Sequence, residues 1–524
     1  MYTKVPMPPP ATVVITGPTG YIGRHLLIAL LRRGYRVIAI ARRRHGLLEQ
    51  RFADVLARLG KEEADRLHVV AGDLTRPLCG VDEESLAGMK RAQGLAFVHG
   101  AGLTRFDAHL EDELRRHNLE GARHSWALCR RLGIPEFHHI STAFVAGDHA
   151  GVWGEHDLER GQGFRNPYEA SKFEAERYLH GVPGNHGPAI TIYRPSIVVG
   201  GQAVGEGRST STVYTFLKTL HFLRECCKRD RAGGRGRLAS LGVSLDEDAV
   251  HVPMRVAGDP EARINLVSIW QVVDTIVHCI GRSAGGLETR HIIGRDFDLE
   301  ETRDRFCAGM AVSGIRYVPD HVFEKQPRNP LEERFYRATR VYHPYMHAAP
   351  RFDPGRGAGR DYPVDLLKLV GEFKQQMDDA REGAHADNLG GMSMACLGVD
   401  SAQHYFERLI RKDFGFDFLR RWRHMDTCIR FSIKGPRGFD RTIRFANESA
   451  RFTTHEAAVC RYEMNEETFH QITYNRLDPR QAFFKGLVTI DGDKEVGLKF
   501  AFFLSDYLRC IDEHVITELS TGPA

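Results

Sequence analysis

The chain has 524 residues, which is too many for one ordinary hydrophobic core and predicts two or three domains. A hydrophobic content of 42% with 27% charged residues is typical of a soluble globular protein, and a net charge of only +4 without a basic block interleaved with aromatics argues against a nucleic-acid binder. The ten cysteines contain no CxxC pair, so we expect reduced thiols in a cytoplasmic protein. The first ten residues lack an apolar stretch, so we expect no signal peptide, and no run approaches the roughly 18 apolar residues of a membrane-spanning helix.

The first predicted element is a short buried strand, Val13–Thr16, followed at once by a glycine turn and an amphipathic helix. The turn carries Gly17, Gly20 and Gly23. Glycines let the backbone approach phosphates closely, and the start of a helix offers unpaired N–H groups and the positive end of its dipole. The stretch therefore predicts a pyrophosphate site at the start of a dinucleotide-binding domain.

Further apolar runs alternate with helical segments as far as about residue 200. The predicted strands are Arg36–Ala41, Leu67–Ala71, Gly94–His99, Glu136–Ile140 and Ala189–Tyr193. Such alternation is typical of a doubly wound parallel sheet of the Rossmann type, an α/β fold.

Arginines follow the second predicted strand, at Arg42, Arg43 and Arg44. An acidic residue at this point would bind the ribose 2′-hydroxyl of NAD, whereas arginines suit the 2′-phosphate of NADP. Arg24, just after the third glycine, could add to the positive charge. We therefore expect NADPH rather than NADH, and the alternative is a solvated basic loop.

The third and fourth predicted strands end in small or acidic residues. Gly72-Asp73-Leu74 closes the third strand, and an Asp there can accept a hydrogen bond from an adenine amine. His99-Gly100-Ala101-Gly102 closes the fourth, where small residues permit contact between the backbone and a dinucleotide. Their order after the glycine turn supports the same cofactor site.

The candidate catalytic residues are Tyr168 and Lys172, which are four positions apart and share one face of a predicted helix. A nearby ammonium favours the phenolate and is expected to lower the tyrosine pKa from its usual value of about 10. Tyr168 would then exchange a proton near neutral pH. Thr142, at the end of the fifth predicted strand, could polarise a carbonyl alongside it.

The segment from about residue 200 to residue 375 is less regular. Val213–Lys228 predicts an apolar helix with a basic end, which is either a packed helix or a lid over a lipophilic substrate, with contact to a membrane surface as a further possibility. Asn265–His278 predicts a strand that leads into a helix.

A small, charged and glycine-containing stretch, Asp378–Ser393, predicts a linker, and the pattern changes beyond it. Cys428–Lys434 and Arg441–Phe445 alternate apolar and polar residues. Leu487–Ile490 and Val496–Phe502 flank Asp491-Gly492-Asp493, which predicts a hairpin. We expect an antiparallel α+β domain that begins near residue 400.

The first part of the chain resembles the extended short-chain dehydrogenase/reductase family over residues 12 to about 375. The resemblance rests on the TGPTGYIG loop, Asp73, Asn118-Leu119-Glu120-Gly121, Thr142, Tyr168, Lys172 and Tyr193-Arg194-Pro195-Ser196. Within the family, His99-Gly100-Ala101, the run Ser141–Gly147 and the run Arg194–Val198 are similar to the male-sterility branch of fatty acyl reductases and carrier-bound thioester reductases. Gly102 departs from that branch, where a second Ala is usual.

The resemblance implies hydride transfer from NADPH to a carbonyl. Thr142 and Tyr168 would bind the developing oxyanion, Tyr168 would donate the proton, Lys172 would bind the nicotinamide ribose, and Asn118 would support the backbone and a proton-relay water. The implied cofactor residues are Gly17, Thr19, Gly20, Tyr21, Ile22, Gly23, Arg42, Arg43, Asp73, Leu74, Ala101, Gly102, Tyr168, Lys172, Pro195 and Ile197. We expect no metal, because the 26 histidines form no close ligand set in the sequence.

The last part of the chain resembles the sterol carrier protein 2 (SCP2) family over roughly residues 405–515. The matching pieces are Asn465–Phe469, the run Arg476–Gly486 with its Leu-Asp-Pro turn, and the predicted strand pair after it. The family encloses an apolar tunnel for acyl chains or sterols. The candidate lining residues are Phe469, Phe483, Phe484, Phe500, Phe502 and Phe503, although plain core packing is the alternative for any one of them.

These expectations combine into a reductase domain over residues 1–377, with a substrate-binding part at about 200–375, a linker over 378–400 and an SCP2-like domain over 401–524. The expected function is NADPH-dependent reduction of a lipophilic acyl thioester or carbonyl, with acyl-CoA, a carrier-bound acyl chain or a sterol as partner. Two alternatives stay open: a 3-oxo or 3-hydroxy dehydrogenase of a sterol or polyketide, and a non-catalytic lipid-transfer protein that senses redox state.

Overall fold

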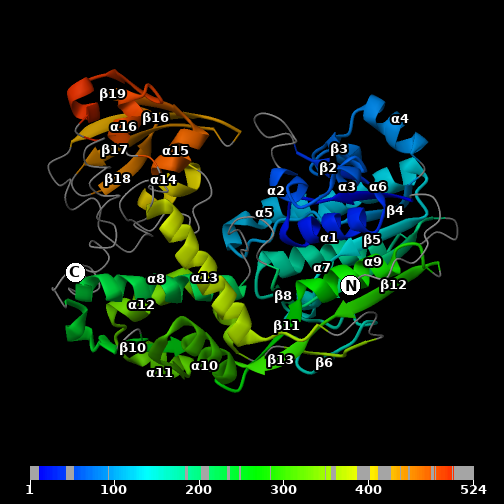
Figure 1. Ribbon diagram of the computed structural model, residues 1–524, viewed down its shortest axis with the longest axis horizontal. Helices are drawn as coiled ribbons and strands as arrows, with labels where there is room; N and C mark the ends of the chain where they lie inside the picture. The colour runs from blue at the N-terminus through cyan, green and yellow to red at the C-terminus, as the bar shows by residue number, and fades with distance from the viewer. Residues whose placement is uncertain are drawn as a thin grey trace. The chain divides into compact units, whose positions relative to one another are not determined.

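The computed structural model describes residues 11–42, 52–92, 94–182, 187–201, 212–232, 237–246, 249–283, 285–347, 350–355, 362–385, 402–410, 426–436, 438–446, 449–473, 477, 479–498 and 500. The chain forms two compact units (Figure 1). The first consists of Met1–Tyr214, Gly258–Thr302 and Val341–Leu369, and the second of Thr215–Ala257, Arg303–Arg340 and Val370–Ala524.

The first unit contains a seven-stranded sheet with the order β12-β7-β5-β4-β1-β2-β3. Its strands are β1 Thr12–Thr16, β2 Arg36–Ala41, β3 Leu67–Ala71, β4 Gly94–His99, β5 Glu136–Ile140, β7 Ala189–Pro195 and β12 Leu287–Ile292. Every neighbouring pair is parallel. The predicted doubly wound sheet is confirmed. Four strands have the predicted bounds, and the observed β1 and β7 are longer than predicted by one and two residues.

Helices cover both faces of this sheet, because alternate strand residues on each face are apolar. One core joins the sheet to α1 Tyr21–Arg32 and α9 Ile269–Cys279. The other joins it to α4 Glu83–Arg91, α6 Gly121–Leu132 and α7 Pro167–His180. The remaining elements of this unit are α2 Ala53–Leu56, α3 Lys61–Ala64, α5 Glu111–Leu114, β6 Val152–Trp153, β8 Ile197–Val199, β11 Arg263–Ser268, β13 Arg295–Asp298 and β15 Arg351–Phe352. Chain order reverses between β1 and β4, and this is the point at which open α/β sheets bind ligands.

The second unit includes a mixed α/β part built from separate stretches of the chain. Its elements are α8 Thr212–Ala232, β9 Ser244–Asp246, β10 Ala249–Ala257, α10 Leu299–Met310, β14 Val312–Val318, α11 Asp320–Lys325, α12 Pro330–Thr339 and α13 Leu366–His385. The predicted helix over Val213–Lys228 lies within α8, and burial of its apolar side chains, such as Leu217 and Leu223, favours the packed-helix interpretation. Helix α13 runs past Asp378, so the predicted linker begins inside a helix, and its later residues lie outside the described ones.

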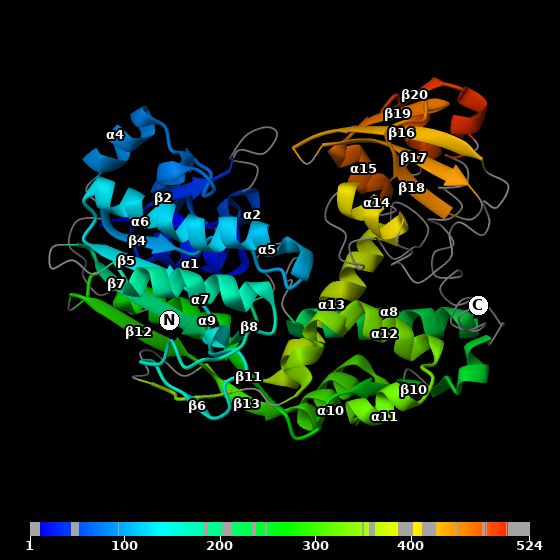
Figure 2. The same cartoon turned by 180° about the vertical axis from the view of Figure 1, so that it is seen from behind.

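The C-terminal part of the second unit is the α+β domain that the alternating pattern predicts (Figure 2). It comprises α14 Ala402–Ile410, β16 Thr427–Lys434, β17 Phe439–Ala446, β18 Ser449–Thr453, β19 Cys460–Asn465, α15 Glu466–Thr473, α16 Pro479–Phe484 and β20 Val488–Gly492. The sheet order is β18-β17-β16-β19-β20. Its central pair, β16 and β19, is parallel, so the sheet is mixed rather than purely antiparallel.

The predicted hairpin at Asp491-Gly492-Asp493 is wrong. Strand β20 pairs with β19, and residues 494–498 are helical. The Asp493 carboxylate accepts hydrogen bonds from the backbone N–H groups of Glu495 and Val496, at 2.9 and 3.1 Å. An Asp in this position satisfies the first free N–H groups of a helix, so it starts the helix instead of turning the chain.

No helix among the described residues is both long enough and apolar enough to cross a bilayer.

A buried ion pair links α7 to the sheet, and its removal is a test of this packing. Arg194 on β7 and Glu176 on α7 have fully buried side chains, with Nη2 and Oε2 at 2.7 Å. Glu176→Gln leaves the guanidinium charge buried without a counter-charge, so we expect the free energy of unfolding to fall by about 3–5 kcal/mol. Urea unfolding followed by tryptophan fluorescence is the measurement.

The exposed pair Arg123–Glu120 provides the matched control for this variant. Glu120→Gln is expected to change the free energy of unfolding by at most about 1 kcal/mol, because exposed pairs are screened by solvent. Equal effects of the two substitutions would show that the buried pair does not stabilise the unit.

Candidate active site

The glycine turn brings the end of β1, the start of α1 and the end of β4 together. Gly17 has φ +74°, and a Cβ there would lie 2.7 Å from the backbone nitrogen of Ala101. A Cβ on Gly23 would lie 1.9 Å from the Gly17 carbonyl oxygen. Gly20 is exposed and caps α1. Only glycine fits at positions 17 and 23, and the exposed helix start provides the anion-binding geometry that the motif predicts.

Two other residues of the turn, Tyr21 and Ile22, direct their side chains inward. The Tyr21 hydroxyl donates to the Gly200 carbonyl, and Ile22 packs against the core on one face of the sheet. The Thr19 carbonyl accepts a hydrogen bond from Arg24 Nε at 3.1 Å. Tyr21 and Ile22 can therefore offer a ligand their backbone rather than their side chains.

The ends of β2 and β3 place a cation beside a carboxylate. Arg42 is exposed directly after β2, while Arg43 lies outside the described residues. Burial of Asp73 opposes its ionisation, but hydrogen bonds from Thr75 and the charge of Arg42 outweigh burial and lower the pKa of Asp73. The Leu74 carbonyl accepts a hydrogen bond from a ring nitrogen of His124 at 2.7 Å. This edge of the sheet can thus offer a polar ligand both a cation, Arg42, and a carboxylate, Asp73.

Asn118 braces the loop after β4. It lies in a π-helical turn, Arg115–Glu120, and such turns are frequent at functional sites. Its amide accepts from the Leu103 N–H at 2.7 Å and donates to the Leu103 carbonyl at 3.0 Å and to Ser171 Oγ at 2.8 Å. A Cβ on Gly102 would lie 2.8 Å from Asn118 Oδ1, which explains why this chain has glycine there instead of the usual alanine.

Thr142, Tyr168 and Lys172 meet at the carboxyl end of β5. Helix α7 begins where Asn166 accepts from the Glu169 N–H and Pro167 occupies the first helical position. Lys172 is buried, and its Nζ donates to the Ile140 carbonyl at 2.6 Å. The Tyr168 hydroxyl is hydrogen-bonded to the Thr142 side chain. The structure therefore brings together the three residues that the motif spacing singled out.

The expected lowering of the Tyr168 pKa is wrong for this structure. Burial raises the pKa of Tyr168 to about 12, although the hydrogen bond with Thr142 acts in the opposite direction. Burial also lowers the pKa of Lys172 to about 8, against the influence of Glu176. Desolvation disfavours the charged form of both groups and is the largest cause of both shifts. Tyr168 is therefore a protonated donor at neutral pH.

Two stacked histidines, His99 and His139, lie beneath this site with their ring centroids 5.2 Å apart. His99 Nδ1 lies 2.8 Å from Thr16 Oγ1 and 3.0 Å from Ser125 Oγ. Burial lowers the pKa of His99 to about 3 and that of His139 well below its usual value, and the charge of Lys172 acts in the same direction. Both rings are neutral at pH 7.

An aromatic wall beside Tyr168 was not predicted from the sequence. The Phe106 ring lies 5.5 Å from the Tyr168 ring and 5.7 Å from the Tyr345 ring. The Tyr345 hydroxyl donates to Glu169 Oε1 at 2.6 Å and accepts from Asn166 Nδ2 at 2.7 Å. No local pattern marks Tyr345, because it reaches the start of α7 from a distant part of the chain.

Pro195 and Ile197 lie at the carboxyl end of β7, beside the end of β5. Pro195 is the last residue of β7 and pairs with Ile292, whereas Ile197 is half-buried at the start of β8. That Pro195 and Ile197 border the nicotinamide part of a dinucleotide stays a prediction.

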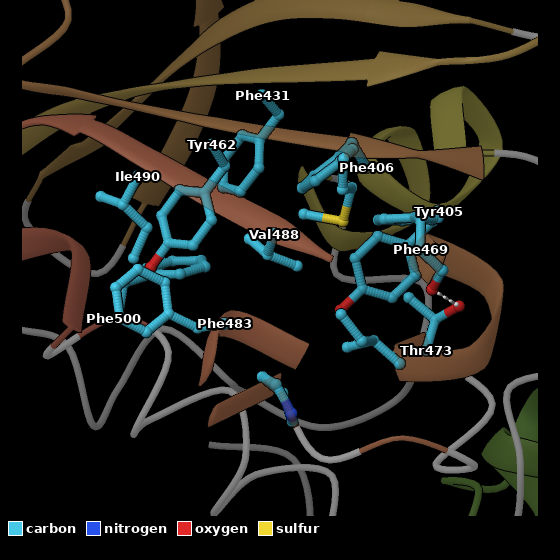
Figure 3. A pocket seen from close by; sticks show the side chains of 13 residues that line it. Tyr405, Phe406, Phe431, Tyr462, Phe469, Thr473, Phe483, Val488, Ile490 and Phe500 are labelled. Carbon is cyan, nitrogen blue, oxygen red and sulfur yellow. Dashed lines mark hydrogen bonds between the residues drawn. The ribbon is translucent and has the colours of Figure 1, made fainter. Parts of the chain in front are cut away.

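The C-terminal domain contains a pocket with an almost wholly apolar lining (Figure 3). It is lined by Tyr405, Phe406, Phe431, Tyr462, Met464, Phe469, Ile472, Thr473, Pro479, Phe483, Val488, Ile490 and Phe500. Three of the predicted lining residues, Phe469, Phe483 and Phe500, are among them. Phe484 is 81% exposed, so its prediction is wrong, because successive residues of a helix point in different directions. Phe502 and Phe503 lie outside the described residues.

The expectation that no metal is bound stays a prediction. Among the described residues, His221, Glu225 and Asp378 place one ligand atom each within 4.8 Å of one another. Arg224 donates to Glu225 at 2.6 Å, so this carboxylate already has a cationic partner.

Comparisons with known proteins confirm the two resemblances. Residues 15–232 match the family described as male sterility protein, an NAD-binding family, and residues 417–505 match the SCP-2 sterol transfer family. A highly reducing polyketide synthase of Penicillium decumbens is 29% identical over 229 residues, which are 40% of this chain and 7% of that protein. An isonitrile lipopeptide synthase of Streptomyces coeruleorubidus is 29% identical over 221 residues, which are 40% of this chain and 14% of that protein.

The chain thus spans only a small part of the curated relatives it matches. Among solved structures, the terminal R domain from the myxalamid PKS-NRPS biosynthetic pathway has a TM-score of 0.55 at 20% identity and covers 72% of this chain and 92% of that domain. This likeness shows the fold. The match to the male sterility family supports the prediction of an oxidoreductase.

The raised pKa of Tyr168 leads to a spectroscopic prediction. We expect the ultraviolet difference between wild type and Tyr168→Phe to show no phenolate absorbance at about pH 8, because burial holds the phenol protonated. The phenolate band is expected only as the pH nears about 12. A phenolate band near neutral pH would show that the lysine charge outweighs burial.

Proposed function

We propose that this chain is an NADPH-dependent reductase of a lipophilic acyl thioester held on a carrier, with its SCP2-like domain binding the apolar chain. The proposal rests above all on the meeting of Thr142, Tyr168 and Lys172 at the end of β5, in the domain that carries the glycine turn. The similarity to polyketide and lipopeptide synthases and to a terminal R domain supports a carrier-bound acyl group as substrate.

The bound cofactor would supply a hydride to the carbonyl carbon. The Thr142 and Tyr168 hydroxyls would donate hydrogen bonds to the carbonyl oxygen, where negative charge develops in the transition state. Tyr168, protonated at neutral pH, would transfer its proton to that oxygen. Lys172, held by the Ile140 carbonyl, would orient the ribose and supply positive charge beneath the phenol. For a thioester, collapse of the reduced centre releases a thiol and leaves an aldehyde.

Water exclusion would come from the aromatic wall. Phe106 contacts the rings of both Tyr168 and Tyr345, and Glu169 accepts a hydrogen bond from the Tyr345 hydroxyl. A low-dielectric wall strengthens the hydrogen bonds to the developing oxyanion. The same wall offers an apolar surface to the carbons next to the carbonyl.

Turnover by Tyr168→Phe tests the proposal. We expect the rate of NADPH oxidation with an acyl thioester to fall by about 10²-fold or more, because a general acid typically contributes that much. Release of free thiol should fall in parallel, whereas binding of a lipid probe to the C-terminal domain should not change.

Tyr178→Phe on the same helix is the matched control and is expected to retain the wild-type rate. Full turnover by Tyr168→Phe would contradict the mechanism and favour a lipid-transfer role. Reduction of a ketone without release of thiol would favour the dehydrogenase alternative.

Cofactor preference tests the role proposed for Arg42. An exposed guanidinium at the end of β2 suits a 2′-phosphate, so Arg42→Ala should lower the ratio of kcat/KM for NADPH over NADH about tenfold. Arg36→Ala, at the other end of the same strand, is the matched control and should leave the ratio unchanged. An unchanged ratio in Arg42→Ala would show either that other residues bind the 2′-phosphate or that the enzyme does not prefer NADPH.

A further inference from the structure

The lining of the C-terminal pocket contains no charged side chain among the described residues (Figure 3). In the described part of the lining, the only side-chain oxygen atoms are the hydroxyls of Tyr405, Tyr462 and Thr473. The Tyr462 hydroxyl donates to the Gly497 carbonyl, and Thr473 Oγ1 donates to the Phe469 carbonyl at 2.9 Å. Burial raises the pKa of Tyr405, so this hydroxyl is neutral as well.

Strand alternation keeps the charges of this sheet away from the pocket. On β19, Tyr462 and Met464 line the pocket, while the intervening Glu463 pairs with Lys434. On β16, Phe431 lines the pocket and the preceding Arg430 pairs with Asp440 at 2.7 Å. The cations nearest in sequence to the lining strands are thus engaged by carboxylates.

The walls themselves consist of packed aromatic rings. Phe406 and Phe431 lie 4.6 Å apart between centroids, and Phe431 stacks on Tyr462 at 5.5 Å. Such walls bury hydrocarbon favourably, at about 0.8 kcal/mol per methylene group. They provide no partner for an ionised head group, and burial of an unpaired carboxylate is strongly unfavourable.

Reduction and hydrolysis of one thioester give products that differ in this respect. Hydride and proton transfer with loss of the thiol leaves an uncharged aldehyde, and a second reduction leaves an uncharged alcohol. Attack by water with loss of the same thiol leaves a carboxylate. The hydrocarbon tail is identical in all three products, so the head group alone decides how well each one suits an uncharged pocket.

We propose that this pocket binds the uncharged reduced product, the aldehyde or the alcohol, and discriminates against the free acid of the same chain. The inference rests on the proposed reductase function for the origin of the ligand, but the binding preference can be measured without turnover. The SCP2-like domain would then remove the released product from the reductase site rather than collect free fatty acids.

A matched ligand series on the full-length wild-type chain tests this proposal. Dodecanol, dodecanal, methyl dodecanoate and dodecanoate compete for bound Nile red, a neutral apolar dye, in the absence of NADPH at a pH where the acid is ionised. We expect the alcohol, the aldehyde and the ester to displace the dye at concentrations at least tenfold lower than dodecanoate. The ester controls for size, because it differs from the acid by one methyl group and the charge.

Competition by dodecanoate equal to that of dodecanol would overturn the proposal, since the carboxylate would then be accommodated at the pocket mouth. Failure of all four compounds to compete would also overturn it. Because no turnover is needed, loss of the ligand preference and loss of reductase activity are separate results, and either can fail without the other.

A pocket-filling substitution assigns the binding to this site. Val488→Phe adds a ring to the lining and should weaken displacement by every neutral ligand, while the exposed Phe484→Ala should change nothing. Thioester reduction with a short soluble acyl group should continue in Phe484→Ala. Unchanged binding by a folded Val488→Phe would overturn the assignment, and if this variant does not fold, the ligand series on the wild-type chain still decides.

Discussion

The hydrogen bond from the buried Lys172 ammonium to the Ile140 carbonyl joins helix α7 to the end of strand β5. A buried ammonium has lost its water and needs an acceptor, so this contact sets the position of the helix along the sheet. Tyr168 lies one turn earlier on the same helix, and Thr142 lies two residues beyond Ile140. Together with the buried Arg194–Glu176 pair on the same helix, this contact determines where phenol and hydroxyl meet.

Desolvation governs the chemistry available at this site. It raises the pKa of Tyr168 and lowers the pKa of Lys172, so both groups are moved toward their neutral forms. A protonated phenol next to a hydroxyl is suited to donate hydrogen bonds and a proton to a carbonyl oxygen. Neutral His99 and His139 beneath it add no competing positive charge. The site favours reduction of a carbonyl over abstraction of a proton by a phenolate.

The two candidate sites of the chain treat charge in opposite ways. The candidate active site concentrates buried polar groups, such as Asn118 and Lys172, and satisfies them with backbone partners. Among the described residues, the lining of the C-terminal pocket carries no charge, because strand alternation turns Arg430 and Glu463 away from it toward Asp440 and Lys434. One site is suited to stabilise developing charge, and the other to hold a product that carries none.

Much of this organisation was predictable from the sequence because it depends on local patterns. Apolar runs located six of the seven strands of the parallel sheet, the spacing of Gly17, Gly20 and Gly23 marked the glycine turn, and helical spacing joined Tyr168 to Lys172. Alternation also located the C-terminal strands. In each case neighbours in the sequence are neighbours in space, so local periodicity is sufficient.

Only the tertiary structure decided the features that depend on distant residues and on burial. Three predictions were wrong: the hairpin at Asp493, the lining role of Phe484 and the lowered pKa of Tyr168. The approach of Tyr345 to Glu169 was not predicted at all. The sequence by itself determined the elements and the residue types of the site. Packing determined which side chains lose water, and desolvation, which no local pattern encodes, then set their charge and their partners.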